Sequence, residues 1–234
     1  MGKKLKIILL AIIILVIASG IYLSIYYHAE KVATDCLNGS ENVSVVKISN
    51  GLLLDGKGNV TAMIFYPGAK VEYTSYLPML MQLANRGIDC YVVEMPFNFA
   101  FFGIDSADSI ISNSSYEHYY ISGHSLGGVM ASQYVNKSDD IDGLILLAAY
   151  PSKDVNVPTL SVYGSNDGVL NHESYDESKS LIKGNFTEFV IDGGNHAQFG
   201  NYGIQTDDGQ ANITPQDQQN QCVNEILSFI KSTA

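Results

Sequence analysis

Residues 123–128 read Gly-His-Ser-Leu-Gly-Gly and contain the spacing Gly-x-Ser-x-Gly. An apolar, strand-like run, Tyr119–Ser122, precedes this motif, and a helical pattern begins at Leu126. A serine on so sharp a turn presents its hydroxyl at the N-terminus of the helix, where free N–H groups favour developing negative charge. We therefore expect Ser125 to be a nucleophile. The alternative is an ordinary glycine-rich turn.

A serine hydroxyl needs a general base, and the base needs a carboxylate that orients it. Two histidines follow Ser125 in the sequence, His172 and His196. His196 comes directly after the last predicted strand, within Gly-Gly-Asn-His-Ala, whereas His172 opens a polar helical stretch. We predict that His196 is the base and that His172 is a solvated residue at a helix start.

The best candidate for the orienting acid is Asp167. It follows the predicted strand Thr159–Tyr163, so its carboxylate should emerge at the same edge of the sheet as the serine and the histidine. Asp154 precedes that strand, and Asp192 lies too near His196 in sequence to orient its ring. The alternative for Asp167 is a turn or helix-capping aspartate.

Attack by a serine also requires two N–H donors for the oxyanion that forms. The N–H of Leu126, directly after the nucleophile, is the first candidate. The second is expected after the predicted strand Thr61–Tyr66, in residues 66–70, Tyr-Pro-Gly-Ala-Lys. There Gly68 permits an unusual backbone and Ala69 presents its N–H. The alternative is an ordinary Pro-Gly turn.

The elements that must position these residues alternate along the chain. Two runs on either side of Asn50-Gly51 predict an antiparallel hairpin. Beyond it, near-continuous apolar runs, typical of strands buried on both faces, alternate with helical stretches. This order predicts a doubly wound α/β fold, with a mostly parallel sheet and the hairpin at one edge. The predicted strands are Val43–Ser49, Leu52–Leu54, Thr61–Tyr66, Ile88–Glu94, Tyr119–Ser122, Gly143–Ala149, Thr159–Tyr163 and Glu188–Ile191, and the predicted helices are Tyr73–Asn85, Leu126–Asn136, His172–Ile182 and Pro215–Ser232, with a weaker one at Ala107–Ser112.

The N-terminus carries a segment suited to a membrane. Ile7–Tyr27 contains no charged residue, and a helix of that length spans about 31 Å, which matches a bilayer core. Three lysines precede it within residues 3–6, which places the N-terminus in the cytoplasm and the remainder outside. A signal peptide cleaved near residues 18–20, Ala-Ser-Gly, is the alternative. We therefore divide the chain into an anchor (or signal peptide) with its linker, 1–34, and a catalytic domain, 35–234.

Composition excludes several classes of protein. Among the 234 residues there are 13 basic and 24 acidic ones, for a formal net charge of −11, so nucleic acid is not an expected partner. The three cysteines are too scattered for a disulfide framework or a paired-cysteine zinc site. Outside the cytosol Cys36 and Cys222 either pair or remain thiols, and Cys90 is expected to be a buried thiol.

With these motifs assembled, the sequence resembles the α/β-hydrolase superfamily, and specifically the compact bacterial group called alpha/beta hydrolase fold-5. The resemblance covers about residues 43–232 and rests on residues 65–72, 123–128 and 193–203. It implies a serine hydrolase that cleaves carboxylic esters of small or medium size through a Ser-His-Asp triad and an acyl-enzyme, with no metal and no organic cofactor. A thioesterase, acyltransferase or lactonase with the same triad is the alternative, as is a non-catalytic binding protein of this fold.

The predicted mouth of the site has no lid domain. Only residues 150–158 separate the strand Gly143–Ala149 from the strand Thr159–Tyr163, and lipases that resemble this family insert a helical lid there. An aromatic segment, residues 97–102, follows the predicted strand Ile88–Glu94. It either binds an acyl chain, touches the membrane or packs in the core.

Overall fold

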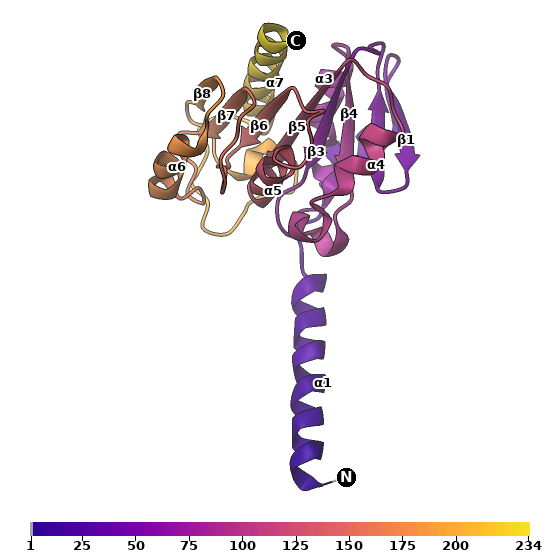
Figure 1. The fold of residues 1–234 in the computed structure, drawn as a ribbon, viewed down its shortest axis with the longest axis vertical. Coiled ribbons are helices and arrows are strands. Elements are labelled where there is room, and N and C mark those ends of the chain that lie inside the picture. The colour runs from indigo at the N-terminus through magenta and orange to yellow at the C-terminus, as the bar shows by residue number, and fades with distance from the viewer. Residues whose placement is uncertain (1) are drawn as a thin grey trace.

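The computed structural model describes residues 2–234, so Met1, the first residue of the expected anchor, lies outside it. Within these residues, eight strands form one sheet in the order β1-β2-β4-β3-β5-β6-β7-β8 (Figure 1). The pairs β1/β2 and β2/β4 are antiparallel, and every other neighbouring pair is parallel. The strands are β1 (Ser44–Ile48), β2 (Gly51–Asp55), β3 (Thr61–Tyr66), β4 (Ile88–Val93), β5 (His118–His124), β6 (Gly143–Leu147), β7 (Thr159–Gly164) and β8 (Phe186–Ile191).

The predicted hairpin is confirmed, and its turn lies at Asn50-Gly51. Ile48 is paired with Gly51, and Gly51 has a φ of +149°. A side chain at Gly51 would collide with the carbonyl oxygen of Val92 on β4, so glycine is needed where β2 joins the rest of the sheet.

Helices cover both faces of the sheet, as Figure 1 shows. In β3, Met63 and Phe65 pack in the cluster that includes α3 and α7, while Ile64 and Tyr66 pack in the cluster that includes α4 and α5. All six residues of β3 are buried, which explains why alternation of polar and apolar residues is missing from its sequence. The predicted fold class is confirmed. The helices of the domain are α3 (Leu77–Ala84), α4 (Ser106–Ser112), α5 (Leu126–Val135), α6 (His172–Ser178) and α7 (Pro215–Thr233).

Two predicted helices begin or end differently in the structure. The stretch predicted from Tyr73 opens with a 3₁₀ turn, η2 (Tyr73–Tyr76), and α3 begins only at Leu77. Pro78 has no N–H, so a continuous α-helix would lack its hydrogen bond to the carbonyl of Thr74. The other helix, predicted to reach Ile182, is α-helical to Ser178 and closes with a 3₁₀ turn, η5 (Lys179–Leu181).

The N-terminal helix α1 (Lys3–Ser24) projects away from the domain (Figure 1). It is long and apolar enough to cross a membrane, a test that signal sequences also pass. The chain after it packs on the domain, because Ala33 of α2 (Lys31–Thr34) is fully buried. A 3₁₀ turn, η1 (Asp35–Asn38), follows.

The three cysteines are free thiols in the structure. Cys36 packs against the cluster that contains Cys222 and Cys90, and burial raises the pKa of each thiol. Cys36 and Cys222 are therefore unpaired thiols in the structure, which is one of the two alternatives left open by the sequence.

Candidate active site

Ser125 occupies a strained turn between β5, which ends at His124, and α5, which begins at Leu126. Its φ of 53° and ψ of −126° are uncommon for a residue other than glycine. The turn is held because the Ser125 N–H donates to the carbonyl of Leu147 at 2.9 Å, and the Ser125 carbonyl accepts from Gly128 at 3.0 Å. The half-buried serine therefore stands at the N-terminus of α5.

The first turn of α5 lies directly against the loop that carries Ala69. A side chain at Gly127 would collide with the carbonyl oxygens of Tyr66 and Pro67, so glycine is required for this approach. Within residues 2–234, the N–H groups of Leu126 and Ala69 donate no hydrogen bond. Both predicted oxyanion donors are therefore available.

The structure brings His196 and Asp167 together. The His196 Nδ1 lies 2.9 Å from the Asp167 Oδ2, and the two side chains are 2% and 0% exposed. The Asp167 Oδ1 accepts the N–H groups of Val169 at 2.9 Å and Leu170 at 2.8 Å. The His196 Nε2 is buried and has no hydrogen-bond partner in the described part of the chain. Such atoms are rare in folded proteins, and this one is free to accept a proton.

The rival residues lie elsewhere. Asp154 is exposed and forms an ion pair with Lys183 at 3.8 Å. Asp192 is also exposed, and so is His172 at the start of α6. Of the aspartates and histidines weighed from the sequence, Asp167 and His196 are the two that contact each other.

A model of the alpha/beta hydrolase family matches residues 62–220, which is more than half of the chain. The chain belongs to the alpha/beta hydrolase family. The protein is therefore an enzyme, a hydrolase that acts on a small-molecule substrate.

Solved structures of alpha/beta hydrolases share this fold. GrgF from Penicillium sp. sh18 has a TM-score of 0.63 at 12% identity, over 82% of this chain and 98% of that one. Est1E from Butyrivibrio proteoclasticus has a TM-score of 0.57 at 14% identity, over 82% of this chain and 100% of that one. Mouse alpha/beta hydrolase domain-containing protein 10 has a TM-score of 0.59 at 11% identity, over 82% of this chain and 99% of that one. A search of curated proteins gives no match.

In this alpha/beta hydrolase a buried network joins three loops at the site. The His124 Nε2 lies 3.1 Å from the carbonyl oxygen of His196 and therefore donates to it. The His124 Nδ1 then accepts from the Tyr76 hydroxyl at 2.8 Å, and that hydroxyl accepts the N–H of Gly68 at 3.1 Å. Burial and the neighbouring His196 lower the pKa of His124 well below its usual range, which favours the neutral ring that this pattern requires. No motif in the sequence marks Tyr76 as part of the site.

Asp208 is a second residue that the sequence did not reveal. Its carboxylate accepts the N–H groups of His196 at 3.2 Å, Ala197 at 2.8 Å and Gly168 at 3.2 Å. It therefore ties the loop that follows Asp167 to the loop that carries His196. The only signal in the sequence is an Asp-Asp-Gly turn at residues 207–209.

Replacing Tyr76 by phenylalanine tests the network. The Tyr76→Phe variant leaves the Gly68 N–H and the His124 Nδ1 buried without partners, so we expect its free energy of unfolding to fall by about 1–3 kcal/mol. Urea unfolding of the full chain in detergent measures this. The matched control is Tyr73→Phe, which makes the same substitution on the same 3₁₀ turn. The Tyr73 side chain is half-buried, and its hydroxyl makes no hydrogen bond within residues 2–234. Equal losses in the two variants would contradict the network.

The hydrolase also contains a cavity of about 470 Å³ beside the His196 loop. Its lining includes Asn195, Gln198 and Asp208, and Ser125 is not among the residues that line it. This cavity is therefore not assigned to the acyl group of the substrate. Within residues 2–234, no group of three or more His, Cys, Asp or Glu side chains is arranged to hold a metal ion.

Proposed function

We propose that this protein is a serine hydrolase that cleaves carboxylic esters of small or medium size through Ser125, His196 and Asp167. The observation that supports this most is the state of the His196 ring. One of its nitrogens is held by Asp167, while the other is buried and has no hydrogen-bond partner within residues 2–234, the Ser125 hydroxyl included. A ring held in this way is ready to take a proton from a serine.

In the first half of the reaction, the Ser125 Oγ attacks the ester carbonyl carbon and its proton passes to the His196 Nε2. The carbonyl oxygen becomes an oxyanion, which the Leu126 and Ala69 N–H groups bind. Asp167 accepts the hydrogen bond from Nδ1–H and stabilises the imidazolium. When the carbon–oxygen bond to the alcohol breaks, the proton on Nε2 goes to the departing alcohol oxygen, and an acyl-Ser125 remains.

In the second half, water attacks the acyl-enzyme. His196 takes a proton from the water, a second oxyanion forms at the same donors, and the Ser125 oxygen leaves with that proton as the carboxylic acid is released. A competing alcohol in place of water would give ester exchange, so product analysis in the presence of methanol separates hydrolysis from acyl transfer.

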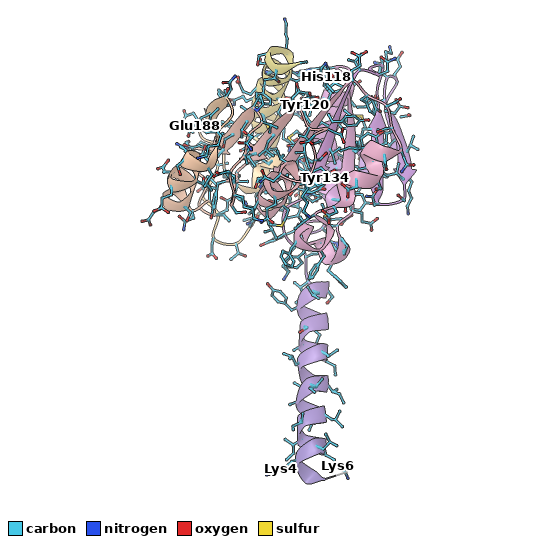
Figure 2. All side chains as sticks on the ribbon, viewed as in Figure 1. Lys4, Lys6, His118, Tyr120, Tyr134 and Glu188 are labelled. Atoms are coloured by element: carbon cyan, nitrogen blue, oxygen red, sulfur yellow. The ribbon has the colours of Figure 1, made fainter. Side chains whose placement is uncertain are left out.

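We further propose that residues 1–34 anchor the protein in a membrane and that residues 35–234 form the catalytic domain on the far side from the cytoplasm. The length and composition of α1 support the span. Lys4 and Lys6 lie at the end of α1 remote from the domain (Figure 2), where the positive-inside rule places the cytoplasm.

A fluorophosphonate probe tests the nucleophile. We expect the full chain in detergent to gain a single adduct by intact mass, because an activated serine attacks the phosphorus and displaces fluoride. Both Ser125→Ala and His196→Ala should lose the adduct, the first because it lacks the nucleophile and the second because it lacks the base.

The control is Ser132→Ala, which removes a buried hydroxyl on α5 that is bonded to the carbonyl of Val129 at 2.6 Å. This variant should label like the wild type. A folded wild-type chain that gains no adduct would overturn the proposal and favour a non-catalytic binding protein of this fold. The same spectrum shows whether residues 1–20 are retained, and so separates an anchor from a cleaved signal peptide.

A further inference from the structure

Three phenylalanines form an exposed apolar rim on the loop after β4. Phe97 of η3 (Pro96–Asn98) and Phe101 and Phe102 of η4 (Ala100–Gly103) are 61%, 62% and 55% exposed. They lie against one another, with ring centroids 5.8 Å apart for Phe97 and Phe102 and 5.6 Å apart for Phe101 and Phe102. Single exposed apolar residues are ordinary, but a contiguous group of large ones marks a surface for an apolar partner.

The rim is held in a strained backbone. Phe97 and Asn98 have φ values of 56° and 57°, a conformation that bulky residues rarely adopt. The carbonyl of Asn98 accepts the N–H of Lys70 at 2.7 Å, and the N–H of Asn98 donates to the carbonyl of Met95 at 3.0 Å. The rim is thereby fastened to the loop that carries Ala69.

The same loop holds the end of the membrane helix. The Tyr27 N–H donates to the carbonyl of Lys70 at 2.7 Å, and the Glu72 N–H donates to the carbonyl of Tyr27 at 2.9 Å. The Lys70 Nζ lies 4.0 Å from the ring centroid of Tyr22 on α1. In Figure 1 the turns that follow β4 lie directly over the domain end of α1. The phenylalanine rim, the loop that carries Ala69 and the segment that follows α1 therefore form one continuous surface.

The direction of the strands places the serine on that surface. Figure 2 shows His118, the first residue of β5, at the end of the domain opposite α1. Because β5 runs from His118 to His124, Ser125 lies at the edge of the sheet that faces α1. A helix that spans a bilayer would bring this edge to the membrane surface.

We propose that the catalytic edge rests on the bilayer, with Phe97, Phe101 and Phe102 inserted in its interface, and that the ester is carried by an amphiphile held in the same leaflet. This inference rests on the proposed function. Lipid is favoured as the occupant because the rim continues the apolar surface of α1. Because the chain has a net charge of −11, attraction to anionic lipids is not expected to drive insertion, which then depends on apolar contact. Zwitterionic phosphatidylcholine should therefore suffice for the rim to insert.

The chain has no tryptophan, so one introduced residue reports its own depth. We expect the fluorescence of Phe101→Trp, with the full chain in phosphatidylcholine vesicles, to shift to the blue and to be quenched at least about twofold by lipids brominated near the carbonyl region. The control is Val60→Trp, at a 44% exposed position on the edge opposite Ser125. An unquenched Phe101→Trp would overturn the inference: emission like that of the control would mean a rim in water, and blue-shifted but unquenched emission would mean a rim covered by protein.

An activity measurement separates this inference from the function on which it rests. The variant F97S/F101S/F102S should hydrolyse a long-chain p-nitrophenyl ester embedded in vesicles about tenfold more slowly, while its kcat/KM on dissolved p-nitrophenyl acetate stays that of the wild type. Equal losses on both substrates would show that the rim supports only the fold, and so overturn it. A wild type inert toward both esters would instead defeat the proposed function, and the depth measurement would still decide where the rim lies.

Discussion

Replacing Ser125 by alanine should lower kcat on p-nitrophenyl acetate by about 10⁶-fold, because the variant keeps the oxyanion donors but loses the atom that carries the acyl group. The loss should fall on kcat rather than KM, since the Ser125 hydroxyl contributes little to binding the ester in its ground state. Stopped assays on the full chain in detergent measure both constants.

The control for this prediction is Ser132→Ala, a serine-to-alanine change seven residues along on the helix that follows Ser125. It should change kcat less than about twofold, because its hydroxyl bonds only within that helix. If Ser125→Ala retained a tenth or more of the wild-type kcat with its fold intact, another residue would have to be the nucleophile.

Replacing Asp167 by asparagine should lower kcat by about 10⁴-fold. The Asp167 Oδ1 accepts two backbone N–H groups, from Val169 and Leu170, so the amide oxygen of asparagine would take that place. Its NH₂ group would then face the His196 Nδ1, which could no longer keep its proton there. The ring would shift its proton to Nε2, the atom that must accept one from Ser125. Steady-state kinetics across pH 6–9 test this, because the loss should persist at every pH.

The matched control is Asp154→Asn, which makes the same change at the rival aspartate. Asp154 is exposed and pairs only loosely with Lys183, at 3.8 Å, so its loss should leave kcat within about twofold of the wild type. A larger loss in Asp154→Asn than in Asp167→Asn would reverse the assignment of the acid.

The sheet and the Ser125 turn could be predicted because local sequence carries the signals that determine them. Strands buried on both faces, such as β3, are apolar at almost every position, and Asn50-Gly51 suits only a tight turn. The spacing of glycines around Ser125 records a steric need, since Gly127 has no room for a side chain. Each of these signals lies within a few residues of sequence, although the atoms that leave Gly127 no room belong to Tyr66 and Pro67.

Tyr76 and Asp208 could not be predicted, because their roles depend on partners that the fold brings from elsewhere. Tyr76 meets His124 across 48 positions of sequence, and Asp208 reaches back 12 positions to His196 and 40 to Gly168. Nothing in hydrophobic periodicity encodes such pairings. For the same reason the sequence does not predict the hydrogen bond from Tyr27 to Lys70, which places the end of α1 beside the loop that carries Ala69.

The hydrogen bond between Tyr27 and Lys70 leaves only residues 25 and 26 between α1 and the first residue that is fixed to the domain. A second hydrogen bond follows three residues later, where the Glu30 N–H donates to the carbonyl of Asn201 at 2.8 Å. A flexible linker would let a membrane-anchored enzyme move through a hemisphere of solution. These hydrogen bonds instead fix the position of Ser125 relative to the end of α1. Once α1 spans a bilayer, copies search by lateral diffusion in two dimensions. Turnover should then scale with the number of ester molecules per unit of membrane area, and not with their concentration in the surrounding volume.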